Sequence, residues 1–197
     1  MKIKICGLFR DEDIDFVNEA LPDYAGFVLN FPKSHRNISL NQAELLKGRL
    51  DKRIQAVGVF VDADIDYIEE AARRKIIDIV QLHGSENADY IAELRRRVWL
   101  PIIRAVKVDG SEIEPLGADI LLLDSGKGTG KAFDHTLICP EKIPVPFFIA
   151  GGITPETIPD LARFQPFGAD ISGGVETDKI KDREKILAAV RAARCID

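Results

Sequence analysis

The chain has 197 residues, of which 46% are hydrophobic and 30% are charged, a balance typical of one globular domain. The net charge of -5 disfavours general binding to nucleic acid or to an anionic membrane, because both are negatively charged. Three cysteines suit a reducing compartment better than a disulfide framework. No apolar run is long enough for a membrane span, and the charged start is unlike a signal peptide. We therefore expect a cytoplasmic protein with a single domain over residues 1–197.

Short apolar segments rich in β-branched residues recur along the chain, and each predicts a strand. Their ends fall at fairly regular intervals, as expected for a repeated strand–helix unit. The predicted strands are residues 2–6, 24–30, 54–61, 77–83, 101–108, 119–124, 146–151 and 169–173.

Amphipathic segments lie between the strands, and several of them begin with residues that favour helix starts. Ser39 and Gln42 have the spacing of a capping box, and Thr154 followed by Pro155 predicts an N-cap with a proline at the first helical position. The predicted helices are residues 43–50 after Ser39, 65–75 after Asp64, 86–97 after Ser85, 158–164 after Thr154, and 183–194 after Asp182.

Alternation of strands and helices with continuously apolar strands predicts an α/β fold with a parallel sheet covered by helices. An open doubly wound sheet and a closed (β/α)8 TIM barrel are both compatible with this order. The count of eight strands favours the barrel. The interval between Val108 and Asp119 is too short for a full helix, so we expect helix 5 of the barrel to be shortened or replaced by a loop.

The ends of the last two strands are rich in glycine. Gly151 and Gly152 follow the seventh strand, and Ser172, Gly173 and Gly174 follow the eighth. Glycines let backbone N–H groups approach an anion closely, and barrel enzymes often bind phosphate at the loops after these two strands. The alternative is that the glycines only make tight turns, but two such clusters on adjacent strands favour the phosphate site.

A further glycine cluster, at residues 125–132, resembles a nucleotide-binding loop only superficially. Ser125 stands where a P-loop requires glycine, and Ala132 stands where it requires serine or threonine. The dinucleotide-binding pattern also fails, because Lys131 takes the place of its third glycine. We expect a loop beside the site, either a lid or a plain solvated loop.

Alternation along the first strand places Lys4 and Cys6 on the face opposite Ile3 and Ile5. The isoleucines should face the helices, so Lys4 and Cys6 should point into the barrel. The same reasoning turns Asp170 inward on the neighbouring eighth strand. Because an unpaired buried lysine would be costly, we predict a buried Lys4–Asp170 ion pair, which would also help to stabilise a Cys6 thiolate.

Other polar side chains are expected at the strand ends. Asp124 closes the sixth strand, Gln81 and His83 share one face of the fourth, and Arg36 lies in the loop after the second, where it could bind a carboxylate. Each could instead be structural: a capping carboxylate, a wall histidine or a surface arginine. No grouping has metal-ligand spacing, and we expect no metal.

Together these motifs resemble the phosphoribosylanthranilate isomerase family along essentially the whole chain. The motifs that carry the resemblance are Lys4-Ile5-Cys6-Gly7, Gly26-Phe27-Val28, Ser34-His35-Arg36, Val57-Gly58-Val59-Phe60, Gln81-Leu82-His83-Gly84, Leu122-Leu123-Asp124-Ser125, Gly128-Thr129-Gly130, Phe133-Asp134, Ala150-Gly151-Gly152-Ile153 and residues 170–176. Four departures stand beside them: Lys127 in the usual Gly-Gly-Thr-Gly, His135 for tryptophan, Phe9 for threonine, and Gly173 in the usual Ser-Ser-Gly.

The resemblance implies a cofactor-free Amadori rearrangement of N-(5'-phosphoribosyl)anthranilate in tryptophan biosynthesis. It implies Asp124 as general acid and Cys6 as general base, with a raised pKa for the acid and a lowered one for the thiol. Arg36 would bind the anthranilate carboxylate. The remaining substrate-binding residues would be Gln81, His83, Gly128, Gly151, Gly152, Ser172, Gly173 and Gly174. The expected partner is a small phosphosugar, and the protein would be a monomer or a homodimer.

Four other functions fit the residues less well. A pentose-phosphate epimerase would need metal ligands at the strand ends, and indole-glycerol-phosphate synthase would need a catalytic Lys/Glu set. A barrel that only binds phosphate would not need Cys6 and Asp124. The related histidine-pathway aminoaldose usually needs two carboxylates and two phosphate sites, whereas the sequence predicts one phosphate site.

Overall fold

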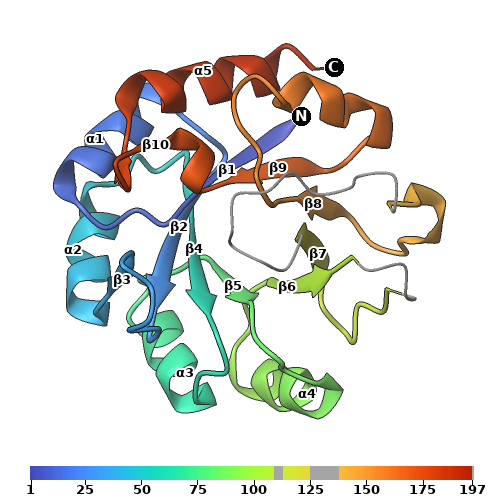
Figure 1. Ribbon diagram of the computed structural model, residues 1–197. Helices are drawn as coiled ribbons and strands as arrows, with labels where there is room; N and C mark the ends of the chain where they lie inside the picture. Colours follow the sequence, from blue (N-terminus) through green and yellow to red (C-terminus); the bar gives the residue numbers. More distant parts are fainter. Residues whose placement is uncertain (109–112, 125–137, 197) are drawn as a thin grey trace.

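The computed structural model describes residues 1–108, 113–124 and 138–196, and it shows a closed eight-stranded parallel barrel (Figure 1). The sheet closes because β1 pairs with β2 on one side and with β9 on the other. The predicted (β/α)8 fold is confirmed. The barrel strands are β1 (Lys2–Cys6), β2 (Tyr24–Leu29), β4 (Gln55–Phe60), β5 (Ile79–Leu82), β6 (Ile102–Lys107), β7 (Ile120–Asp124), β8 (Phe147–Ile149) and β9 (Gly168–Ile171).

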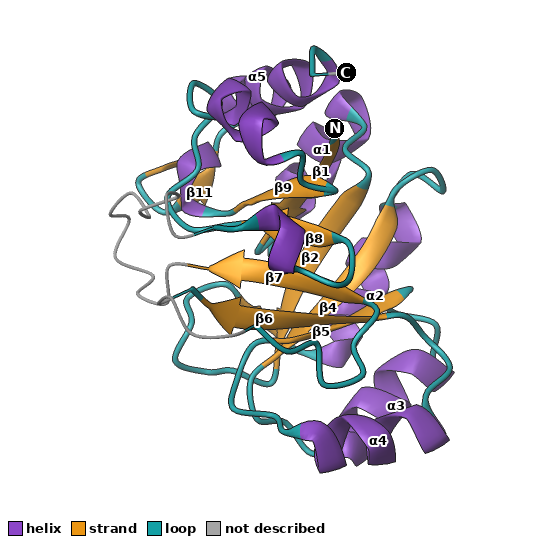
Figure 2. Ribbon diagram, turned by 90° about the vertical axis from the view of Figure 1, so that its right-hand side faces the viewer, coloured by secondary structure: helices purple, strands orange, loops and turns teal. Residues whose placement is uncertain are grey.

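Helices surround the barrel on the outside, as Figures 1 and 2 show. The α-helices of the described residues are α1 (Asp11–Ala20), α2 (Leu40–Arg49), α3 (Ile65–Arg73), α4 (Ala88–Arg97) and α5 (Arg183–Arg194). A 3-10 helix at Pro140–Lys142 precedes β8, and another at Ile158–Phe164 lies between β8 and β9. The described residues between β6 and β7 contain no helix, in agreement with the expected loss of helix 5.

The helix starts agree with the sequence analysis only in part. The Ser39 side chain accepts a hydrogen bond from Gln42 N and the Asp182 side chain from Lys185 N, so both are N-caps. Among the described residues, no hydrogen bond from Ser39 N to the Gln42 side chain completes the capping box, and the Gln42 amide donates to the Phe9 carbonyl at 2.9 Å.

Two expected caps are wrong. Ser85 does not cap α4: Asn87 does, and the Ser85 hydroxyl donates to Asp62 at 2.8 Å. Thr154 does not start the helix after β8, because Thr157 precedes it and accepts from Thr154 N. In both cases a nearby polar group competes for the side chain or backbone, which local sequence patterns do not show.

Three short strands lie outside the predicted set. β3 (Asn37–Ile38) adds to the barrel beside β2, and β10 (Glu176–Thr177) pairs with β11 (Ile180–Lys181) as an antiparallel hairpin. At two residues each they are too short for any periodic pattern. Figure 2 places β11 at the same end of the molecule as the tip of the β7 arrow, where the parallel strands end.

The apolar core has two parts. The larger part lies between the sheet and the helices, and a smaller cluster fills the barrel interior with side chains that alternate with the outward ones. The interior cluster consists of Tyr24, Val57, Ile79, Ile103, Leu122, Phe148 and Ala150.

A charged pair interrupts the apolar interior. Lys4 and Asp170 are Cα partners in the β1–β9 register, and Lys4 Nζ lies 2.8 Å from Asp170 Oδ1. The side chains are 0% and 8% exposed. The predicted Lys4–Asp170 ion pair is therefore confirmed, and it lies one pleat below Cys6.

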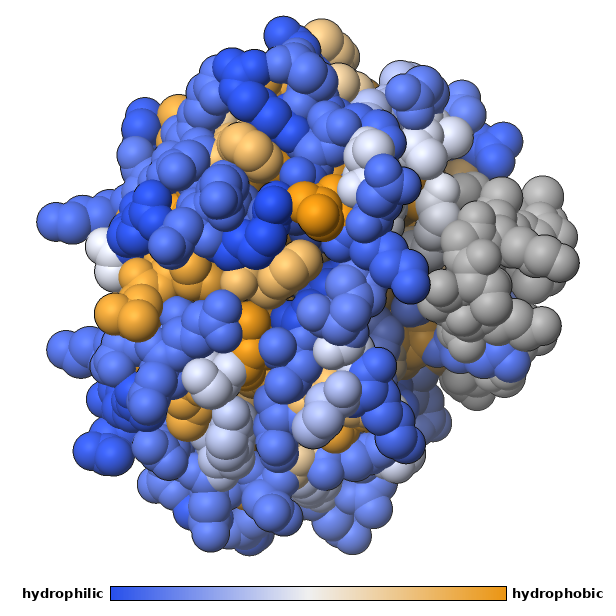
Figure 3. All heavy atoms as spheres, turned by 60° about the vertical axis from the view of Figure 1, so that its left-hand side comes forward, coloured by the Kyte–Doolittle hydropathy of each residue, from blue (hydrophilic) through white to orange (hydrophobic). Residues whose placement is uncertain are grey.

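The surface face in Figure 3 is mostly hydrophilic with scattered apolar side chains. Of the described residues, the large hydrophobic side chains that are exposed are Leu45, Trp99 and Ile180. Isolated exposed apolar residues are normal for a globular protein and need no partner.

Replacing Lys4 alone should destabilise the fold strongly, because Asp170 would keep a buried charge without its partner. We expect Lys4→Met to lower the free energy of unfolding by about 3–5 kcal/mol. The double variant Lys4→Met/Asp170→Leu should recover most of that loss, because neither position then carries a charge. Urea denaturation measures both; a loss under about 1 kcal/mol in the single variant would contradict a stabilising role for the pair.

Candidate active site

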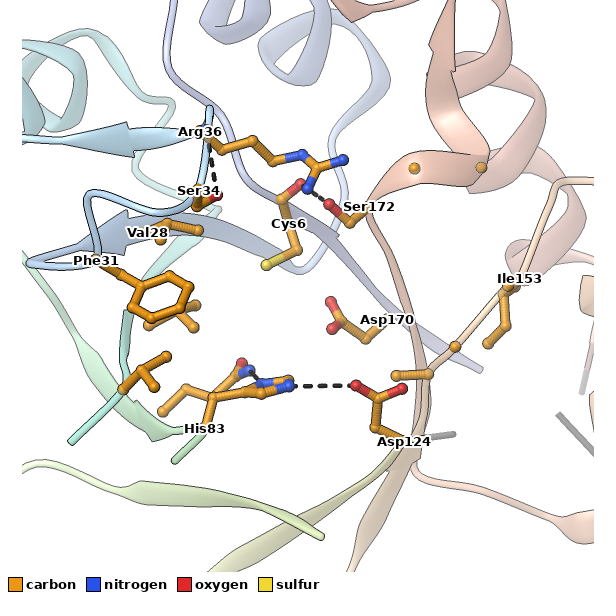
Figure 4. A pocket seen from close by; sticks show the side chains of 18 of the residues that line it. Cys6, Val28, Phe31, Ser34, Arg36, His83, Asp124, Ile153, Asp170 and Ser172 are labelled. Carbon is orange, nitrogen blue, oxygen red and sulfur yellow. Dashed lines mark hydrogen bonds and ion pairs between the residues drawn. The ribbon is translucent and has the colours of Figure 1, made fainter. Parts of the chain in front are cut away.

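A cavity of about 590 Å³ opens at the carboxyl ends of the barrel strands, and this size suits a small-molecule site. Figure 4 shows side chains from opposite walls of the barrel pointing into it. The sequence-predicted site residues that line it are Cys6, Arg36, Gln81, His83, Asp124, Gly151, Gly152, Ser172, Gly173 and Gly174. Gly128 lies outside the described residues.

Cys6 ends β1, and its side chain points into the cavity (Figure 4). The residue is only 8% exposed. Burial raises the pKa of the thiol, because a thiolate is poorly solvated there, and this effect outweighs the attraction of the neighbouring Lys4 ammonium. The expectation of a lowered thiol pKa is therefore wrong. Lys4 lowers the pKa of the thiol, as expected, but this effect is smaller than that of burial.

Gly26 makes room for the thiol and the ammonium. It is the Cα partner of Cys6 in the β1–β2 register. A Cβ at this position would lie 2.9 Å from Cys6 Sγ and 3.2 Å from Lys4 Nζ. Any larger residue at position 26 would therefore displace the Cys6 thiol and the Lys4 ammonium.

On the opposite wall, Asp124 ends β7 and belongs to a short hydrogen-bonded chain. His83 Nε2 lies 3.2 Å from Asp124 Oδ2, and His83 Nδ1 lies 3.0 Å from Gln81 Nε2 (Figure 4). Gln81 is 1% exposed, so this hydrogen-bonded chain of side chains begins in the barrel interior. In this arrangement Nδ1 accepts from the amide, so Nε2 carries the imidazole proton and directs it at Asp124.

The glycine-rich loops after β8 and β9 meet at the cavity. Gly151 and Gly152 have φ values of 86° and 69°, which few other residues adopt without strain. A Cβ on Gly174 would lie 1.9 Å from the Ile153 carbonyl oxygen, so the two loops pack backbone against backbone. The Ser172 hydroxyl donates to the Cys6 carbonyl at 3.1 Å and ties the β9 end to the β1 end.

Arg36 enters the cavity from the segment before β3 (Figure 4). Its guanidinium makes two hydrogen bonds to Glu176, from Nε to Oε1 and from Nη2 to Oε2, each 2.7 Å long. Glu176 is bound in addition by Lys181 at 2.7 Å. Glu176 ends the motif of residues 170–176, which predicts no role for it, and no sequence signal points to Lys181, because its burial depends on the β10–β11 hairpin.

The described residues contain no group of three or more His, Cys, Asp and Glu side chains that could hold a metal ion. Within the same residues, no helix is both long and apolar enough to cross a membrane.

The family of the chain follows from its sequence. A family model described as N-(5'-phosphoribosyl)anthranilate (PRA) isomerase matches residues 3–192. The chain belongs to the PRA isomerase family. It is accordingly an isomerase, as the resemblance implied.

Relatives and solved structures agree with this assignment. The N-(5'-phosphoribosyl)anthranilate isomerase of Endomicrobium trichonymphae is 43% identical over 202 residues, which cover 99% of each chain. The phosphoribosyl anthranilate isomerase structure from Thermus thermophilus superposes with a TM-score of 0.87 at 26% identity and covers 100% of both chains. A PRA isomerase in complex with reduced 1-(o-carboxyphenylamino)-1-deoxyribulose 5-phosphate matches with a TM-score of 0.81 at 29% identity over 98% of each chain.

The raised pKa of Cys6 can be measured through its rate of alkylation. Cys139 and Cys195 are exposed, so the variant Cys139→Ser/Cys195→Ser leaves Cys6 as the sole thiol. Because only the thiolate reacts, the rate of iodoacetamide labelling should rise with pH to a midpoint above that of free cysteine in the same buffers. A midpoint equal to or below that of free cysteine would show that Lys4, and not burial, dominates.

Proposed function

We propose that the chain is a single-domain, cytoplasmic enzyme that converts N-(5'-phosphoribosyl)anthranilate to 1-(2-carboxyphenylamino)-1-deoxyribulose 5-phosphate in tryptophan biosynthesis. The observation that carries the proposal is the cavity itself, which has a thiol and a carboxyl on opposite walls of a barrel of this family. The bound reduced deoxyribulose phosphate in a related structure supports the same substrate class.

The reaction needs two proton transfers, and the two walls supply one group for each. Asp124 donates a proton to the furanose ring oxygen, the C1'–oxygen bond breaks, and the anilino nitrogen forms a protonated imine with C1'. The thiolate of Cys6 then removes the C2' proton, and the electron pair forms the enolamine as the imine is neutralised. Loss of the enol proton and protonation at C1' give the ketone. Groups facing each other across the sugar suit this sequence.

The Gln81–His83 pair supports the acid role of Asp124. During the acid step the proton lies on the Asp124 oxygen that faces the sugar, so Oδ2 can still accept the hydrogen bond from His83 Nε2. Gln81 Oε1 is buried and has no hydrogen-bond partner in the part of the chain that the structure describes. This oxygen therefore takes no part in orienting Asp124, which depends on the Gln81 Nε2–His83 Nδ1 contact.

The raised pKa of Cys6 is compatible with a base. A thiol of higher pKa is the stronger proton acceptor, although a smaller fraction is ionised at neutral pH. Lys4, on the same face of β1, favours the thiolate over the thiol. Asp170 acts in the opposite direction and raises the pKa of the thiol, so only the lysine of the buried pair favours the thiolate.

The substrate carries two anionic groups, a phosphate and a carboxylate, and the cavity is lined by glycine loops and by the Arg36 guanidinium. The phosphate is proposed to bind the backbone N–H groups of the Gly151, Gly152, Gly173 and Gly174 loops, which can surround an anion. Arg36 would bind the anthranilate carboxylate. No step in this sequence requires a cofactor or a metal.

We expect Cys6→Ser and Asp124→Asn each to lower kcat by at least about 10²-fold, because each removes one proton transfer. The assay generates the labile substrate in situ and follows the loss of anthranilate-type fluorescence. Binding of the reduced product analogue should persist in both variants, and Cys139→Ser, which removes an exposed thiol, should match the parent enzyme. Unchanged turnover in either active-site variant would remove its assigned role.

A serine at position 173 should strengthen phosphate binding. Among the described residues, the nearest atom to a Cβ there is Arg36 Nη2 at 3.9 Å, so a serine side chain displaces none of them. One hydrogen bond from a hydroxyl to a charged oxygen predicts up to about a tenfold lower Kd for ribose 5-phosphate in Gly173→Ser. Calorimetry measures this Kd, with Gly173→Ala as the matched control. A Kd as weak in the serine variant as in the alanine variant would place the phosphate elsewhere.

A further inference from the structure

The Arg36 guanidinium is held by its neighbours before any substrate arrives. Glu176 binds it side-on through Nε and Nη2, with both distances at 2.7 Å. The Arg36 side chain is 23% exposed and that of Glu176 only 7%. The contact is therefore largely shielded from water, and bidentate charge-assisted hydrogen bonds of this kind fix the orientation of the guanidinium plane.

Glu176 is itself fixed from behind. Glu176 and Lys181 are Cα partners in the β10–β11 hairpin, and Lys181 Nζ donates to Glu176 Oε1 at 2.7 Å and to the Ser172 carbonyl at 3.0 Å. The Lys181 side chain is fully buried. Although burial opposes ionisation of Glu176, the hydrogen bonds from Arg36 and Lys181 lower its pKa to about 2, so the carboxylate stays ionised at neutral pH.

The other side of Arg36 is limited by Gly7. This residue has a φ of 78°, and a Cβ on it would lie 2.3 Å from Arg36 Cδ. The arginine stem thus crosses directly over the β1 end, beside Cys6. Glu176 and Gly7 together leave the guanidinium little freedom to swing.

Because Glu176 contacts one edge of the Arg36 guanidinium, that contact decides which of the arginine N–H groups remain for a ligand. A guanidinium has five N–H groups, and the side-on contact uses the Nε proton and one Nη2 proton. Within the described part of the chain, no hydrogen bond occupies the end-on pair, one proton each from Nη1 and Nη2, and Arg36 lines the cavity. This pair matches the two oxygens of a planar carboxylate. Arg36, Glu176 and Lys181 together carry a net charge of +1, which suits one carboxylate.

We propose that Glu176 is a positioning residue that sets specificity for a substrate carboxylate by clamping Arg36 with its end-on N–H pair toward the cavity. The identification of that carboxylate as the anthranilate group rests on the proposed function. The clamp itself rests only on the contacts among Arg36, Glu176, Lys181 and Gly7.

A matched pair of ligands tests the clamp directly. One is reduced 1-(o-carboxyphenylamino)-1-deoxyribulose 5-phosphate, and the other is the same compound made with aniline, which lacks the carboxylate. In Glu176→Gln one carboxylate oxygen becomes an NH2 group that cannot accept from Arg36. We expect about a tenfold or greater rise in Kd for the first ligand, and less than a twofold change for the second.

The kinetic readout should show the same selectivity. We expect Glu176→Gln to raise KM with kcat changed much less, because Cys6 and Asp124 are not disturbed. Glu176→Asp keeps the charge, but its side chain is one methylene shorter and no longer reaches Arg36 in the same way. It should therefore also weaken binding of the carboxylate-bearing ligand selectively. Thr177→Val, on the same hairpin but outside the clamp, should bind both ligands as the parent protein does.

Each outcome separates the clamp from the proposed function. If Glu176→Gln weakens the binding of both ligands equally, or of neither, the positioning role is overturned. Arg36→Met tests the carboxylate subsite itself: if it leaves the carboxylate-bearing ligand unaffected, the proposed binding mode fails. If Arg36→Met weakens that ligand while Glu176→Gln and Glu176→Asp do not, the subsite stands and only the clamp is wrong.

Discussion

Closure of the sheet between β1 and β9 is the constraint on which the site depends. It makes the first and last strands neighbours, so Lys4 meets Asp170, and the Ser172 hydroxyl reaches the Cys6 carbonyl. It also gives all eight strands one common end, where residues more than 100 positions apart, such as Cys6 and Asp124, line the same cavity. An open sheet would place β1 and β9 at different edges and would separate the thiol from the glycine loops.

Charge within the barrel is arranged in pairs that leave specific groups available. Asp170 balances Lys4 inside the barrel, so the ammonium can be buried close to the thiol at a tolerable cost. At the rim, Glu176 balances one of two cations, Arg36 and Lys181, and one positive charge remains. His83 connects Asp124 to the buried Gln81 amide. Each reactive or binding group thus has a partner that orients it without neutralising the whole site.

Much of this could be predicted from the sequence where it follows from strand alternation. The inward direction of Lys4, Cys6 and Asp170 follows from the isoleucines next to them. The lack of a helix among the described residues between β6 and β7 follows from the short length of that interval. Side-chain competition could not be predicted: Ser85 is bound to Asp62 instead of capping α4. The burial of Lys181 and Glu176 depends on a hairpin of two-residue strands that folds back to the rim. The thiol pKa depends on how fully the finished barrel excludes water from Cys6, which no pattern of residue types reveals.

The central claim is that a thiol and a carboxyl act on the sugar from opposite walls. A crystal structure of the protein with reduced 1-(o-carboxyphenylamino)-1-deoxyribulose 5-phosphate tests this most directly. We expect Cys6 Sγ to lie against C2'. The Asp124 carboxyl should lie within about 2.6–3.2 Å of the oxygen on C4', which is the former ring oxygen. A ligand bound with C2' turned away from Cys6, or with both side chains on the same face of the sugar chain, would contradict it.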